Sequence, residues 1–176
     1  MKTNTCCFFG HKTISVTAEL ELTLNRVIRK LIVENKVDTF LFGSKSQFND
    51  LCYEQVTKLR EEYPDIKRVY VRAEFSEISD VYRAYLLRRY EDTYYPQKAL
   101  NAGKAVYVRR NYEMIDKSNF CVVYYREEYS PASRKSGTKC ALDYALKNKR
   151  IIFMLPKREG CLIGCNREMN KNVIVR

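Results

Sequence analysis

Short apolar runs alternate with longer amphipathic stretches along the chain. Apolar runs of strand length cover residues 4–10, 37–44 and 66–75, and the first two reach a glycine near their ends. Between them, residues 20–35 and 50–63 space their hydrophobic side chains at helical intervals. This predicts the order strand, helix, strand, helix, strand with short connections. Such an order is typical of right-handed βαβ units and of a parallel sheet covered by helices on both faces.

The second half of the chain repeats this pattern after a less regular middle. Residues 80–96 and 102–118 predict two helices, and residues 119–125 and 150–156 predict strands on either side of a helix at 137–149. We find no internal repeat and no linker, so all 176 residues are expected to form one domain. The expected fold class is α/β: a single Rossmann-like domain with a mainly parallel sheet of about five strands and helices on both faces.

Composition excludes several classes of protein. Hydrophobic residues make up 45% of the chain and charged residues 30%, and no apolar run approaches the roughly 20 residues that cross a bilayer. The first residues, MKTNTCCFFGHK, have too short an apolar stretch for a signal peptide. We therefore expect a cytoplasmic protein that has no membrane partner.

Cysteine and histidine usage argues against a metal centre. The cysteines that lie inside apolar strand-like or helix-like patterns are Cys6, Cys7, Cys121 and Cys140. There a free thiol behaves as a small hydrophobe, so we expect these residues to be reduced. Cys161 and Cys165 are four positions apart, but no second Cys/His pair completes a zinc site and His11 is the only histidine. The sequence predicts no metal ion and no cofactor.

The net charge of +11 favours an anionic partner. The excess is uneven, because residues 147–176 carry eight Lys or Arg against two Glu. A solvated basic tail and a nucleic-acid site are both open interpretations of this end. The oligomeric state also stays open, a homo-oligomer included.

The candidate site follows from the fold, because ligands of open parallel sheets bind at the carboxyl ends of the strands. The loops at those ends contain Gly10, His11, Lys12, Gly43, Ser44, Lys45, Ser46, Ser136, Gly137 and Thr138, together with the segments that begin at Arg72 and follow Tyr125. Their glycines let backbone N–H groups approach an anion, their hydroxyls donate hydrogen bonds, and their lysines neutralise phosphate charge. The Ser-Gly-Thr turn has two interpretations, a helix cap or a phosphate cradle.

Two kinds of aromatic side chain have more than one interpretation. Ten of the fourteen tyrosines fall between positions 82 and 129, where they either close the edge of the core or stack on a base. We expect Tyr125 or another of these to face a base. His11 is an acid, a hydrogen-bond donor or a packed side chain, and we favour the donor.

The motifs CCFFGHK, FLFGSKSQF, RRNYEMIDKSNFCVVYY and SGTKCALDYALKNKRI, in this order over residues 5–155, resemble the SLOG superfamily, the Smf/DprA and Lonely Guy group. The similarity is greatest to its small uncharacterised bacterial and phage members with a Gly-His-Arg first loop. The resemblance implies a Rossmann-like sheet that binds nucleotides or nucleotide-derived ligands. The implied site positions are Gly10, His11, Lys12, Gly43, Ser44, Arg110, Asn111, Gly137 and Thr138, with Lys12 in place of the usual arginine.

One departure from the family bears on catalysis. Lonely Guy enzymes, which cleave the N-glycosidic bond of nucleoside monophosphates, carry a Pro-Gly-Gly-x-Gly-Thr-x-x-Glu motif, and here SRKSGTKCA lacks the Pro-Gly-Gly and puts Ala141 at the glutamate position. Alanine can neither stabilise an oxocarbenium-like centre nor activate water. The nearest carboxylates are Asp143, Asp116, which has a structural alternative as a cap or ion pair, and Glu74, which alternatively binds a ribose hydroxyl.

We therefore predict a module that binds a phosphorylated, nucleotide-derived ligand as a sensor or by sequestration. Ser136, Gly137 and Thr138 would cradle phosphate, and Lys12, Lys45 and Arg110 would supply charge. The enzyme alternative is a phosphoribohydrolase or deoxyribosyl transferase with a displaced carboxylate. The other alternative is a nucleic-acid-binding protein that uses the basic C-terminal end, which we disfavour because residues 151–155 within it predict a buried strand.

Overall fold

The computed structural model describes residues 4–43, 45–129 and 136–155. These residues form a six-stranded sheet in the order β4-β3-β2-β1-β5-β6, in which every neighbouring pair is parallel. The strands are β1 (Asn4–Gly10), β2 (Val37–Phe42), β3 (Lys67–Val71), β4 (Asp92–Tyr94), β5 (Phe120–Tyr124) and β6 (Ile151–Leu155). The predicted α/β fold with a parallel sheet is confirmed, with one strand more than expected.

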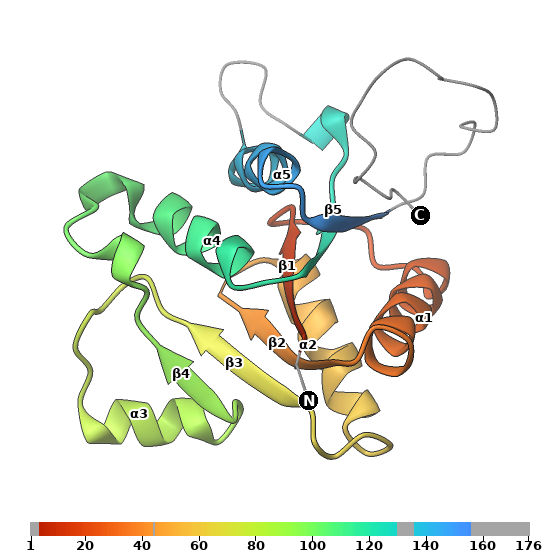
Figure 1. Cartoon of the computed structure of the whole chain (residues 1–176), viewed down its shortest axis with the longest axis horizontal. Coiled ribbons are helices and arrows are strands. Elements are labelled where there is room, and N and C mark those ends of the chain that lie inside the picture. The colour runs from red at the N-terminus through yellow and green to blue at the C-terminus, as the bar shows by residue number, and fades with distance from the viewer. Residues whose placement is uncertain (1–3, 44, 130–135, 156–176) are drawn as a thin grey trace.

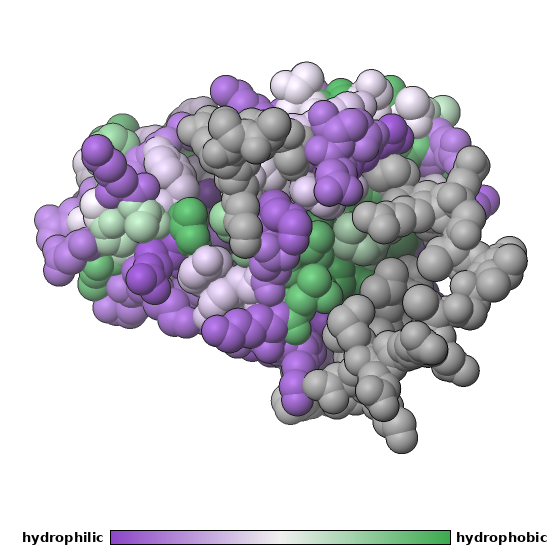
Figure 2. Space-filling model, turned by 90° about the horizontal axis from the view of Figure 1, so that it is seen from above, coloured by the Kyte–Doolittle hydropathy of each residue, from purple (hydrophilic) through white to green (hydrophobic). Residues whose placement is uncertain are grey.

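Helices cover both faces of the sheet (Figure 1). The α-helices are α1 (Ala18–Val33), α2 (Gln47–Leu59), α3 (Asp80–Leu87), α4 (Val106–Asp116) and α5 (Gly137–Lys147), and short 3₁₀ turns lie at η1 (Gln97–Ala99), η2 (Gly103–Ala105) and η3 (Glu127–Tyr129). α1 and α2 pack on one face and α4 and α5 on the other. Figure 2 shows hydrophilic residues over much of one side of the molecule, with hydrophobic residues in smaller groups between them.

The apolar run of β1 supplies both layers of the core. Cys6 and Phe8 point towards α1 and α2, whereas Cys7 and Phe9 point towards α4 and α5. Successive side chains of a strand point to opposite faces, so a strand that is covered on both sides needs a continuous apolar run rather than an alternating one. The cysteines of β1 are free and buried, as expected for small hydrophobic side chains.

The order in which strands are added reverses at β1. The chain first adds β2, β3 and β4 on one side of β1, and it then adds β5 and β6 on the other side. Right-handed crossovers in these two directions put the connecting helices on opposite faces of the sheet. The reversal leaves a crevice between the loops that follow β1 and β5, where α/β folds bind ligands.

The predicted helix over residues 80–96 is shorter than expected. α3 ends at Leu87, and the chain then forms β4, which pairs with β3. Glu91 anchors this change, because its carboxylate accepts hydrogen bonds from the backbone N–H of Arg68 at 2.6 Å and from the Arg68 guanidinium at 2.7 Å. Tertiary contacts of this kind override the local helical spacing.

The basic C-terminal end from residue 156 onward lies outside the described residues, and so do Cys161 and Cys165. The nucleic-acid alternative and the expected absence of a zinc site at this end therefore stay predictions. Among the helices that the structure describes, none is long and apolar enough to span a bilayer.

Gly10 marks the closest approach of β1 to α2. A Cβ atom at Gly10 would lie 2.3 Å from the Phe48 ring of α2. Phe48 is fully buried and packs at 5.4 Å between ring centroids on Tyr124 of β5, so the ring has no space to move aside.

We predict that Gly10→Ala lowers the free energy of unfolding by about 1–3 kcal/mol, the usual cost of overpacking a core. Gly137→Ala is the matched control, because a Cβ there meets no atom within 4 Å. Urea unfolding followed by circular dichroism measures both changes. Equal stability of the two variants would contradict the close packing of β1 on α2.

Candidate functional site

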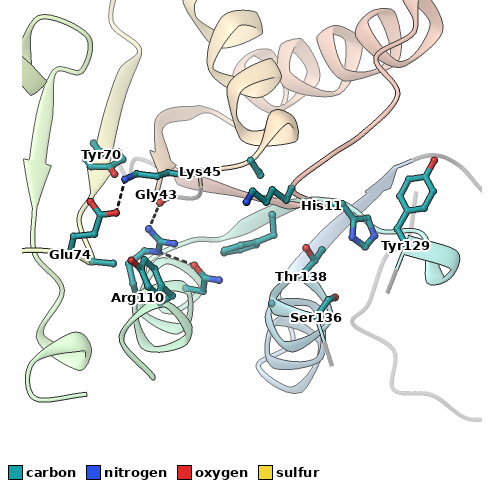
Figure 3. Close-up of a pocket in the computed structure, with 17 residues that line it drawn as sticks. His11, Gly43, Lys45, Tyr70, Glu74, Arg110, Tyr129, Ser136 and Thr138 are labelled. Atoms are coloured by element: carbon teal, nitrogen blue, oxygen red, sulfur yellow. Dashed lines mark hydrogen bonds and ion pairs between the residues drawn. The ribbon is translucent and has the colours of Figure 1, made fainter. Parts of the chain in front are cut away.

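A cleft of about 920 Å³ opens at the carboxyl edge of the sheet (Figure 3). Its walls come from the loops after β1, β2 and β3, from α4, from η3 and from the first turn of α5. The structure brings together at this cleft the predicted residues Gly10, His11, Lys12, Gly43, Lys45, Arg110, Asn111, Ser136, Gly137 and Thr138. Loops that are far apart in the sequence thus converge as the parallel topology predicts. Ser44 lies outside the described residues.

The first turn of α5 forms one end of the cleft. Ser136 is the helix cap, because its hydroxyl oxygen accepts a hydrogen bond from the backbone N–H of Lys139 at 3.1 Å. The cap interpretation is therefore confirmed, and Ser136, Gly137 and Thr138 also line the cleft. The first N–H groups of a helix have no acceptor within it and carry the positive end of its dipole. This end of the cleft therefore favours an anion.

His11 is buried beside this helix start, with 6% of its surface exposed. The backbone N–H of Arg126 donates a hydrogen bond to Nε2 of His11 at 2.9 Å. A neutral imidazole whose Nε2 accepts must carry its proton on Nδ1, so His11 is a hydrogen-bond donor through Nδ1. Burial lowers the pKa of His11, which keeps the ring neutral at pH 7. This geometry favours the expected donor over a general acid.

The tyrosine next to His11 in the cleft is Tyr129 and not Tyr125. The Tyr125 ring stacks on the His11 ring with 5.4 Å between centroids and packs against the core, outside the cleft lining. Tyr129 approaches the same ring edge-on, also at 5.4 Å, and lines the cleft. Tyr125 therefore lies outside the cleft lining and its ring supports His11, because the chain turns at η3 only after it. That another of the tyrosines at positions 82–129 faces a base stays a prediction.

Arg110 occupies the opposite end of the cleft and is 4% exposed. One guanidinium nitrogen, Nη1, donates to the backbone carbonyl oxygens of Gly43 and, at 3.4 Å, Val71, while Nε donates to Asn111 Oδ1 at 2.9 Å. Burial lowers the pKa of Arg110. Within the described part of the chain no carboxylate forms an ion pair with it, so its positive charge is available to a ligand.

Glu74 and Lys45 form an ion pair in the cleft, with 2.6 Å between Lys45 Nζ and Glu74 Oε1 (Figure 3). The hydrogen bond to Glu74 raises the pKa of Lys45. The Glu74 side chain is 30% exposed and comes from the loop after β3. Glu74 and Arg110 both line the cleft, and the ion pair is made through Glu74 Oε1.

The other candidate carboxylates lie outside the cleft lining. Asp116 binds Lys98 and the Tyr144 hydroxyl, which confirms its structural alternative. Asp143 pairs with Lys139 one helical turn away. Ala141, at the position of the family's glutamate, is 1% exposed and packs in the core between α5 and the sheet.

Phe9 and Tyr70 of the cleft were not predicted, and Tyr107 and Tyr129 were included only as unnamed members of the tyrosine group at positions 82–129. For one of them the sequence held a usable signal. Tyr107 precedes Arg110 and Asn111 by three and four positions, so the three side chains share one face of α4. Ser46 had been noted in the loop after β2, but its function there as the cap of α2 had not.

Comparison with known proteins does not assign a family. The chain matches no protein-family model, and no curated protein is significantly similar to it in sequence. The chemistry of the cleft is therefore judged from its own geometry: cations, hydroxyls and two helix starts that suit an anion, and tyrosines that suit a planar group. In the described ranges, no three His, Cys, Asp or Glu side chains lie together as metal ligands.

The single histidine makes its own titration measurable. We predict that His11 titrates below the usual pKa of about 6.5 in the folded protein, because its burial disfavours the charged ring. The unfolded chain then takes up its proton first on acidification, so stability falls as the pH drops below about 6.5 towards the folded pKa. One-dimensional NMR of the imidazole protons reads the pKa directly.

The matched control is His11→Gln, in which this part of the pH dependence of unfolding should disappear. The urea-unfolded wild-type protein supplies the reference pKa. A folded pKa at or above the unfolded value would contradict the neutral, Nε2-accepting His11.

Proposed function

We propose that the protein binds an anionic nucleotide or nucleotide-derived small molecule in this cleft, as a sensor or by sequestration. The observation that carries the proposal is the convergence of Lys12, Lys45 and Arg110 with the start of α5 around one concave site. Membership of the SLOG superfamily belongs to the same proposal and is supported by the order of the motifs and by the parallel fold.

Charge supports an anionic ligand. The described lining carries the cations Lys12, Lys45 and Arg110 against one carboxylate, Glu74. Since Lys45 and Glu74 neutralise one another, Lys12 and Arg110 remain as net positive charge. A phosphate at the first turn of α5 would meet helix N–H groups, the Thr138 hydroxyl and the Nδ1–H of His11.

Shape and lining support a nucleoside rather than phosphate alone. Small-molecule sites are concave, occupy about 300–1,000 Å³ and combine apolar or aromatic walls with a few polar groups. The cleft has a volume in this range, and the rings of Tyr70, Tyr107 and Tyr129 form part of its walls. Aromatic rings stack on nucleobases without requiring a particular base.

A second candidate function rests on the position of Glu74. Cleavage of an N-glycosidic bond needs a carboxylate near the reacting carbon, and Glu74 is the carboxylate among the described lining residues. We favour binding without turnover, because Lys45 engages Glu74 in an ion pair and Ala141, at the position of the family's glutamate, supplies no carboxylate.

We predict that a nucleoside phosphate raises the melting temperature. At a hundredfold excess over Kd, the free energy of unfolding should increase by about 2.7 kcal/mol. Lys12→Ala should weaken this binding about tenfold, the effect of losing one charge-assisted contact. Lys58→Ala is the matched control, since Lys58 is also exposed but lies in the last turn of α2, away from the cleft. Differential scanning fluorimetry and calorimetric titration measure both effects.

Inorganic phosphate and sulfate complete this experiment. If they stabilise the protein as much as every nucleotide does, the cleft is a general anion site and the nucleotide proposal is wrong. An equal loss in Lys12→Ala and Lys58→Ala would show that binding occurs elsewhere.

We also predict that incubation with nucleoside monophosphates releases no free base at a turnover near 1 s⁻¹ or above, the ordinary range of enzymes. Chromatography of the mixtures measures the released base. If release occurs, is lost in Glu74→Gln and persists in Asp116→Asn, the glycosidase function replaces the one proposed here. Asp116 is a suitable control because it is held by Lys98 and Tyr144 outside the cleft.

A further inference from the structure

The two ends of the cleft have similar chemistry. At the α5 end, Tyr129 lies next to the His11 donor and the first turn of the helix. At the α4 end, Tyr70 and Tyr107 lie next to Arg110, whose charge is 5.9 Å from the centre of the Tyr107 ring. Figure 3 shows His11 and Tyr129 on one side of the cleft and Tyr70, Glu74 and Arg110 on the other. Each end therefore combines an aromatic wall with a donor or a cation.

The middle of the cleft differs from both ends. Gly10 ends β1 and Gly43 follows β2, and both line the cleft. The space that a Cβ would take is filled by Phe48 at Gly10 and by Arg110 at Gly43. Lys12 and the start of α2 lie beside Gly10, because the backbone N–H of Gln47 donates to the Lys12 carbonyl oxygen at 2.9 Å. An exposed lysine beside a helix start suits phosphate groups.

A mononucleotide would leave part of this arrangement unused. With its phosphate at the α5 turn and its base beside Tyr129, such a ligand would not contact the tyrosines of the α4 end. Arg110 would then stay more than nine-tenths buried and without an anion. A cleft of about 920 Å³ is at the upper end of the range for small-molecule sites, so it has room for a second nucleoside.

We infer that the ligand is a dinucleotide: two nucleosides, one in each end of the cleft, joined through phosphate beside Lys12. The inference rests on the proposed function and adds the second nucleoside to it. Tyr129 stacks on one base, and Tyr107 or Tyr70 stacks on the other. Glu74 Oε2 accepts a hydrogen bond from a hydroxyl or amino group of the second nucleoside, while Lys12 and Arg110 contact the phosphates.

Calorimetric titration of the full chain with matched probes tests this inference. The probes are AMP, ADP, ADP-ribose, the linear dinucleotide pApA and diadenosine diphosphate, each also with guanine in place of adenine. At least one dinucleotide should bind ten or more times as tightly as the mononucleotides and ADP-ribose of the same base. ADP controls for the additional phosphate, and ADP-ribose controls for the second sugar without a second base.

Two variants separate the ends of the cleft. Tyr107→Leu should weaken dinucleotide binding at least fivefold more than it weakens mononucleotide binding, whereas Tyr129→Leu should weaken both to a similar extent. Tyr85→Leu is the matched control, because Tyr85 is exposed on α3 and does not line the cleft. An equal loss of affinity for both ligands in Tyr107→Leu would contradict the assignment of separate ends.

The outcomes distinguish this inference from the proposed function. If the Kd of a mononucleotide or of ADP-ribose is within tenfold of the Kd of every dinucleotide, the inference of a second nucleoside is wrong, while the proposed nucleotide binding stands. If none of the probes binds, the proposed function fails as well. Tighter dinucleotide binding that is unchanged in both Tyr107→Leu and Tyr129→Leu would place the dinucleotide elsewhere and would also overturn the inference.

Discussion

The cleft depends on one buried cation, Arg110. Its guanidinium crosses the ends of β2 and β3 and donates to the carbonyl oxygens of Gly43 and Val71. Burying a charge costs several kcal/mol unless polar groups compensate it. Here neutral backbone oxygens provide the compensation, so the contact fixes α4 against the sheet without cancelling the charge. Gly43 permits this arrangement, because a Cβ there would lie 2.8 Å from Arg110 Nη1.

The sequence predicted the sheet and the place of the cleft because both follow from burial. A strand covered on both faces must be apolar throughout, so β1 and β5 were recognisable as continuous runs. Parallel strands then bring their carboxyl ends to one edge, which selects the loops after Gly10 and Gly43. These inferences needed no knowledge of individual side-chain directions.

Features that depend on long-range contacts were harder to predict. β4 exists because Glu91 binds Arg68, which is 23 positions away, and local spacing favoured a longer helix instead. Tyr129 rather than Tyr125 lines the cleft because the chain turns at η3, which begins only after Tyr125. The sequence could not show which of Asp116 and Glu74 lies in the cleft. Their ion-pair partners decide this: Asp116 pairs with Lys98 outside the cleft, whereas Glu74 pairs with Lys45 inside it.

The helices that begin at the cleft belong to opposite layers of the molecule. α2 packs on one face of the sheet and α5 on the other, yet Ser46 and Ser136, their caps, line the same cavity. A molecule held between these two helix starts would join the layers at an edge where no strand continues. Binding energy gained at both helix starts would then oppose the separation of the two layers, so occupancy of the cleft would stabilise both faces of the sheet at once.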